Sequence, residues 1–155
     1  RGDATRAMEI LLPLAEAGDR EAQYFVGYLY DYSIVFSDRC EATKWYDRAA
    51  RQGYPPAQYV LAFAYLGDSG VYADAEKAYR WALAASRNGV EAATEWLNLG
   101  LFSDALSTAE REAIDRDMET WRPEDEPPAL VIRIPDFPLA GTVSFVPDPC
   151  KPLAD

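Results

Sequence analysis

Histidine is absent from this 155-residue sequence, and its absence removes several kinds of chemistry. Without an imidazole, the chain cannot activate a serine or cysteine nucleophile in a Ser-His or Cys-His arrangement. It also cannot use histidine as a general base or as a zinc ligand. Chemistry based on carboxylates or lysine remains open.

Cysteine is scarce, since Cys40 and Cys150 are the only two and lie far apart in the sequence. Their spacing fits no metal-binding motif, so we expect neither a metal site nor a cofactor. An even number permits one long-range disulfide, which would suit an oxidising compartment. The alternative is two unrelated thiols, and the choice depends on geometry that the sequence does not reveal.

Long apolar runs are also missing. No stretch reaches the roughly 18 apolar residues that suggest a transmembrane helix, so we expect no membrane insertion. Basic residues are outnumbered, with 15 Lys and Arg against 26 Asp and Glu, which gives a net charge of −11. A field of that sign disfavours nucleic acid and anionic membranes as partners. Because the sequence begins with Arg1, we expect a mature or trimmed form, in which a removed signal peptide is neither visible nor excluded.

An internal repeat dominates what the sequence does contain. Gly18, Gly53 and Gly89 are spaced almost evenly, and the same residue types recur around them. Alanine stands four residues after each glycine and again eleven residues before it. Large apolar residues follow at eight after (Val26, Leu61, Leu97) and at eight before (Ile10, Trp45, Trp81). Agreement at so many positions predicts three copies of one structural unit.

Each unit is predicted to be a pair of helices joined at the glycine. The residues Ala42, Trp45, Ala49 and Ala50 follow helical spacing, and a second apolar face begins after Gly53. The glycine suits the left-handed residue that ends a helix, and a proline pair suits the start of the next. We expect Pro13 to kink or shorten the first helix. Asp74 is predicted to be the N-cap that opens the third unit.

A capping helix is predicted after the third unit. Ser107 and Glu110 form a capping-box pair, and Ile114, Met118 and Trp121 mark one apolar face on an otherwise charged helix. This is the composition expected for a terminal cap of a repeat array. We therefore assign residues 1–122 to a solenoid with its capping helix.

Residues 123–155 differ in character, because they hold eight of the eleven prolines and show no helical period. Two β-like runs, 130–134 and 142–146, could pair as a hairpin or lie extended along the helices. The apolar residues in these runs favour a segment packed on the solenoid over a disordered tail. If the cysteines pair, this segment is tied to the start of the second unit.

The repeat resembles the SEL-like repeat, an α/α solenoid related to the tetratricopeptide repeat. The resemblance covers about residues 3 to 102. It rests on a signature of small residues, Trp and Lys-Ala that is most complete between the second and third units: Tyr65, Gly67, Gly70, Val71, Asp74, Lys77, Ala78, Trp81, Ala85, Gly89 and Ala93. Three positions depart from it, because Ile34 and Val35 replace the Gly-Val pair and Asn98 replaces a small residue. The first turn between units must therefore have another shape.

The resemblance implies an all-α, right-handed superhelix that binds other proteins, often in the bacterial periplasm or in secretory pathways. Some relatives act as regulators of envelope sensors or as immunity proteins against secreted toxins. Cysteine-rich relatives linked to β-lactam binding carry a cysteine pair within each repeat, which this chain lacks.

One candidate binding site can be placed on the first helices, which line the concave surface in related solenoids. Basic residues stand at two matching positions of the second and third units, and Arg48 falls between those of the second unit. We name this set the first-helix stripe: Lys44, Arg48, Arg51, Arg80 and Arg87. The functional hypothesis is that the stripe forms a groove that receives an acidic segment of a partner. The interpretation that we favour is a solvated face, or pairing with carboxylates of the same chain, including Glu124, Asp125 and Glu126.

Other candidates have plainer interpretations. The aromatic residues at helical spacing, such as Tyr28, Phe63 and Tyr79, are expected mainly in the core, with some exposed as binding anchors. Carboxylates two residues apart, such as Glu110 and Glu112, do not face each other on a helix, which argues against catalysis.

The sequence as a whole predicts non-enzymatic protein recognition. The leading hypothesis is a periplasmic inhibitor, such as an immunity partner of a secreted effector or toxin. A structural or regulatory scaffold of the cell envelope comes next, and a histidine-free enzyme is a distant third. A cytoplasmic location is the alternative to the periplasm.

Overall fold

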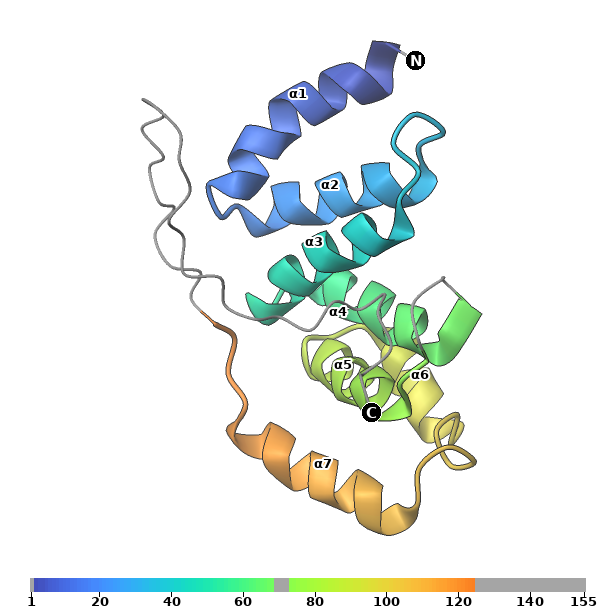
Figure 1. Cartoon of the computed structure of the whole chain (residues 1–155). Coiled ribbons are helices and arrows are strands. Elements are labelled where there is room, and N and C mark those ends of the chain that lie inside the picture. Colours follow the sequence, from blue (N-terminus) through green and yellow to red (C-terminus); the bar gives the residue numbers. More distant parts are fainter. Residues whose placement is uncertain (1, 69–72, 125–155) are drawn as a thin grey trace, which may run out of the picture.

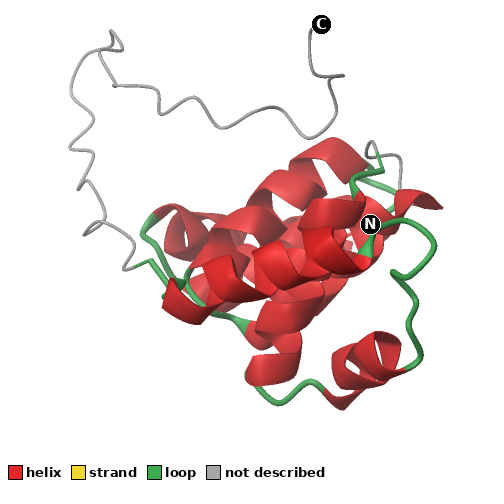
Figure 2. Ribbon diagram, turned by 90° about the horizontal axis from the view of Figure 1, so that it is seen from below, coloured by secondary structure: helices red, strands yellow, loops and turns green. Residues whose placement is uncertain are grey.

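The computed structural model describes residues 2–68 and 73–124, and every regular element in this part is helical (Figures 1 and 2). The elements are α1 (Gly2–Glu16), α2 (Arg20–Tyr32), α3 (Arg39–Arg51), α4 (Pro55–Phe63), η1 (Ala64–Asp68), α5 (Ala75–Arg87), α6 (Glu91–Asn98) and α7 (Thr108–Thr120). The predicted all-α class is therefore confirmed.

The helices form a solenoid in which each packs on the next along the chain, from α1 through to α6. Figure 1 shows the stack running from α1 at one end to α7 at the other. The three helix pairs are α1–α2, α3–α4 and α5–α6, as the repeat predicts. The last helix, α7, packs on α5, the first helix of the third pair. It thus occupies the side of the solenoid on which another first helix would lie.

The three anchor glycines end α1, α3 and α5 in the same way. Gly18, Gly53 and Gly89 have φ angles of 101°, 79° and 87°, a region in which only glycine is free of strain. Each glycine N–H bonds the carbonyl three residues back, and the following N–H bonds the carbonyl five residues back. This is the Schellman arrangement, which satisfies the last carbonyls of a helix. The regular spacing of these glycines along the chain therefore reflects the regular spacing at which the first helices end.

Side chains cap the helices that follow polar loops. Asp19, Asp38 and Asp74 each accept a hydrogen bond from a backbone N–H in the first turn of α2, α3 and α5. Ser107 and Glu110 make the predicted capping box at the start of α7. The helices α4 and α6 have Tyr54 and Val90 at the N-cap position and make no side-chain cap. In α4 the proline at the first position removes one N–H that would need a partner.

Two local features differ from expectation or were not foreseen. Helix α1 continues through Pro13 to Glu16, so the predicted shortening does not occur. Helix α4 ends at Phe63 and passes into a π-helical turn, in which Gly67 has φ of 108°. The carbonyl of Tyr65 then accepts from the backbone N–H of Asp74, 2.9 Å away, which links this turn to the start of α5.

Small residues at the helix contacts let the units approach closely. The alanines at the repeated positions are almost completely buried: Ala22, Ala42, Ala49, Ala57, Ala78, Ala85 and Ala93. Between the first two units, the ring of Tyr46 lies directly over Gly27, where an added Cβ atom would come within 2.8 Å of it. The junction between α2 and α3 therefore depends on a glycine on one helix and an aromatic ring on the other.

The chain returns toward the second unit after α7. The backbone N–H of Glu124 donates to the carbonyl of Arg51 at 2.8 Å, and the ring of Pro123 packs beside Gly53. The packing of the proline-rich segment, its two β-like runs and the pairing of Cys40 with Cys150 concern residues outside the described part. They stay predictions.

Candidate protein-binding surfaces

The half of the first-helix stripe that lies on α3 is at the surface. Lys44 forms a salt bridge with Glu41 on the same helix, with Nζ and Oε1 2.6 Å apart. The guanidinium of Arg48 lies over the ring of Trp45, 4.6 Å from its centre. These side chains occupy successive turns of α3, as their spacing predicts.

Arg51 at the end of α3 has partners on two elements. Its Nε atom donates to Asp47 Oδ2 at 2.5 Å, and its Nη1 atom lies 3.6 Å from Glu124 Oε1. Partial burial disfavours its charge, but the hydrogen bond to Asp47 and the two negative charges outweigh this and raise the pKa of Arg51. Glu124 is one of the carboxylates named in the alternative interpretation, so pairing within the chain accounts for this arginine.

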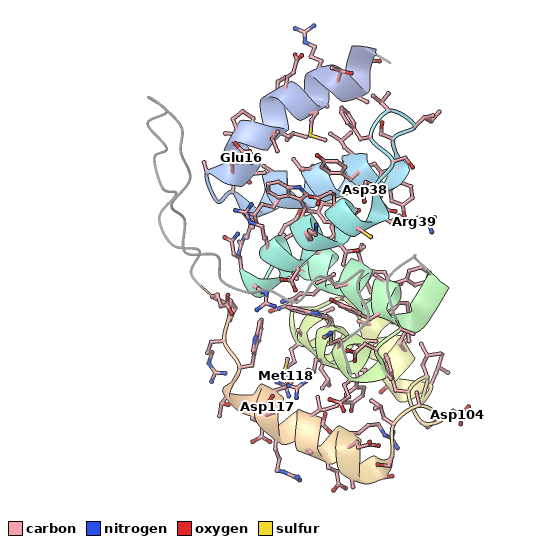
Figure 3. The ribbon with its side chains drawn as sticks, in the orientation of Figure 1. Glu16, Asp38, Arg39, Asp104, Asp117 and Met118 are labelled. Atoms are coloured by element: carbon pink, nitrogen blue, oxygen red, sulfur yellow. The ribbon has the colours of Figure 1, made fainter. Side chains whose placement is uncertain are left out.

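The half of the stripe on α5 is engaged by the capping helix. Arg80 pairs with Asp117, and Nη1 of Arg87 donates to the carbonyl oxygen of Met118 at 2.5 Å. Figure 3 shows Asp117 and Met118 on the side of α7 that faces α5. These two arginines therefore hold α7 in place, and the part of the stripe that a partner could reach without displacing α7 lies on α3.

Two buried glutamines that the sequence analysis missed connect the units. Gln23 and Gln58 stand at the same place in consecutive second helices and are completely buried. Gln23 donates to the carbonyl of Ala15, and Gln58 does the same to Ala50, each over 3.1 Å.

Each of these glutamines also accepts a hydrogen bond from the next unit. Gln52 Nε2 donates to Gln23 Oε1 at 2.8 Å, and Asn88 Nδ2 donates to Gln58 Oε1 at 2.9 Å. We name Gln23, Gln52, Gln58 and Asn88 the amide ladder. The signal in the sequence is an amide beside the buried alanine in the second helices of the first two units, a position where an unpaired polar group would be costly. The third unit has Thr94 there, which is exposed.

Replacing Gln58 by leucine should lower the free energy of unfolding by about 1–2 kcal/mol, because two hydrogen bonds worth about 1 kcal/mol each are lost at similar volume. Denaturation in urea, followed by circular dichroism, measures the change. The matched control is Thr94→Val at the equivalent exposed position, which should stay within about 0.5 kcal/mol of the parent. Equal losses in the two variants would contradict a structural role for the ladder.

The aromatic residues divide between core and surface. Tyr79 is buried, and its hydroxyl donates to Asp115 Oδ1 at 3.1 Å. Tyr59 and Phe63 on α4 both contact the ring of Trp96 on α6, with ring centres 4.7 and 6.2 Å apart. Tyr28 and Phe63 are exposed. The expectation of a mainly internal role holds for Tyr79, whereas the exposed aromatics lie on the second helices.

The described residues do not form a cation site or a membrane span. Within residues 2–68 and 73–124, no three metal-ligating side chains gather in a group. No helix in the same ranges is both long and apolar enough to cross a membrane. The carboxylate Glu110, one of the pair considered for catalysis, is the partner of Ser107 in the capping box, and this hydrogen bond lowers the pKa of Glu110.

Comparison with known proteins identifies the repeat. The sequence profile of the Sel1 repeat matches residues 20–54 and again residues 55–90. Each match covers the second helix of one unit and the first helix of the next, so the two matches correspond to α2–α3 and to α4–α5. No curated protein and no solved structure matches the chain. Sel1 repeats are interaction modules that are generally non-catalytic. The helix pairs and these two matches together show that residues 20–90 of the chain are built of Sel1 repeats.

Proposed function

We propose that this protein is a non-catalytic binding module that acts in the bacterial periplasm as the inhibitor of a secreted effector, as an immunity protein does. The observation that carries the proposal is the position of Lys44 and Arg48, because Arg51 is already paired with Asp47 and Glu124. Lys44 and Arg48 follow one another on successive turns of α3, while α7 engages the arginines of the stripe on α5. A short acidic segment of a partner fits a basic surface of this extent.

The energetics of the existing contacts favour exchange with a partner. The salt bridge between Lys44 and Glu41 is solvent-exposed, and such pairs contribute only about 0–1 kcal/mol. A partner carboxylate that excludes water from Lys44 and Arg48 would form a stronger charge-assisted hydrogen bond. A disulfide between Cys40 and Cys150, one of the two alternatives for these cysteines, would suit an oxidising compartment such as the periplasm.

Reversing the charges of the exposed Lys44 and the half-buried Arg48, with Lys44→Glu and Arg48→Glu together, should weaken partner binding at least tenfold, which corresponds to about 1.4 kcal/mol. The tagged full chain is purified from its bacterial host, and the molar mass of the complex is measured by light scattering after size-exclusion chromatography. We expect one partner at equal stoichiometry with the parent and a much smaller yield of complex with the variant.

A control with the same change in charge is Arg6→Glu with Arg116→Glu, because both arginines are exposed on other helices. This control should retain the complex. Several partners in small amounts would instead support a scaffold of the cell envelope. A single partner that binds both variants equally well would leave inhibition intact but remove the first-helix stripe from the interface.

A further inference from the structure

The second helices expose large apolar side chains at the same position in all three units. Tyr28, Phe63 and Leu99 each stand ten residues after a turn glycine and are 46%, 47% and 82% exposed. Single exposed apolar residues are ordinary on protein surfaces, but an aligned series is not. The repetition places these side chains on the outward side of consecutive second helices, opposite the buried alanines.

Neighbouring side chains extend this surface along the helices. Tyr32 stacks on Tyr28 with ring centres 4.6 Å apart and is itself exposed, and Leu66 is exposed one turn after Phe63. Trp96 bridges α4 and α6 through its ring contacts with Tyr59 and Phe63. We name Tyr28, Tyr32, Phe63, Leu66 and Leu99 the second-helix stripe. Its surface is rich in aromatic groups, which dominate the energetics of protein interfaces.

The charges around the second-helix stripe are mainly negative. The helices α2, α4 and α6 contain a single basic residue, Arg20, whose guanidinium donates to the carbonyl of Gln52. Exposed carboxylates flank the stripe on α2 and α6, at Glu21, Glu91 and Glu95. The basic residues of the solenoid lie instead mainly on α3 and α5. The two sides of the solenoid thus differ in sign as well as in polarity.

We propose that the second-helix stripe is a second binding surface, separate from the first-helix stripe, and that it binds an amphipathic segment of a partner protein whose apolar residues are flanked by lysine or arginine. The apolar side chains of such a segment would cover Tyr28, Phe63 and Leu99. Its cations would face the carboxylates of α2 and α6 and could lie over the exposed aromatic rings.

The test uses the full chain and three labelled synthetic peptides. One is a helical peptide of leucine and lysine with one apolar face, the second has glutamate in place of lysine, and the third is a scrambled leucine–lysine sequence without an apolar face. Fluorescence anisotropy should show that only the first peptide binds well. Phe63→Ser with Leu99→Ser should weaken this binding at least tenfold, while thermal melting confirms that the variant is folded.

The matched control is Ile10→Ser with Leu14→Ser, because these apolar residues on α1 are similarly exposed, at 59% and 49%, but lie on another helix. This control and Lys44→Glu with Arg48→Glu should both bind the leucine–lysine peptide as the parent does. Equal binding of the glutamate peptide, or equal loss in the Ile10 and Phe63 variants, would overturn the proposal. Self-association of the parent that disappears in the Phe63 variant would overturn it in favour of a second copy as the occupant.

Discussion

Replacing Phe102 by alanine should lower the free energy of unfolding by about 3–5 kcal/mol, the usual cost of removing a large aromatic side chain from a core. Phe102 is only 1% exposed, although it lies in the connection between α6 and α7. Its ring meets that of Tyr79 edge-on with centres 5.3 Å apart, within the same core cluster as Ile114 and Met118 of α7. Phe102 thereby fixes the connection that positions the capping helix.

Urea denaturation of the Phe102→Ala variant, followed by circular dichroism, measures this loss. The neighbouring Leu101 offers a control in the same connection, because its side chain is exposed. Leu101→Ala should change the free energy of unfolding by no more than about 0.5 kcal/mol. A Phe102 variant as stable as the Leu101 variant would show that the connection contributes little to docking of α7.

Replacing Gly27 by valine should cost about 1–3 kcal/mol, because new methyl groups would collide with the ring of Tyr46. Valine has a better intrinsic helix propensity than glycine, so the propensity change acts in the opposite direction and the loss reports the collision. The free energy of unfolding is measured for Gly27→Val in the parent and in a Tyr46→Ala background. We expect most of the cost of valine to disappear when the ring is absent, with a smaller remainder from the backbone oxygen of Ala42, which lies 3.1 Å from the added Cβ atom.

A second control separates the ring of Tyr46 from its hydroxyl. The hydroxyl is buried and has no hydrogen-bond partner among the described residues, and burial raises the pKa of Tyr46 so that it stays neutral. Tyr46→Phe should therefore keep the full penalty of Gly27→Val. If valine costs the same amount in the Tyr46→Ala background, the close approach of α2 and α3 is not what requires glycine at position 27.

The sequence was sufficient to predict the helix pairs because its signals are local. Gly53 ends α3 through its own backbone conformation, and Ser107 caps α7 through a residue three positions away, so neither depends on distant contacts. The apolar spacing of each helix likewise follows from its own period. These local features do not depend on how the helices are arranged relative to one another.

The candidate site was harder to predict because it depends on tertiary partners. Arg80 and Lys44 occupy the same place in their units, yet only Arg80 lies opposite a carboxylate of α7. No local pattern reports that α7 packs on α5. Pro13 shows the same limit, because neighbouring packing lets a helix continue past a residue that disfavours it. Gln58 could have been found by asking why an amide stands on an apolar face.

The end of the amide ladder has a consequence for the motions of the solenoid. Helix α6 has eight residues, no side-chain cap, and Thr94 in place of a buried glutamine. Because it lacks these stabilising features, we expect α6 to have the lowest free energy of local unfolding among the six paired helices. Leu99 is the cap residue of this helix, so we expect the edge of the second-helix stripe at Leu99 to open more readily than the parts on α2 and α4. A surface that is rigid on one side and adjustable on the other can accept partners that differ in shape.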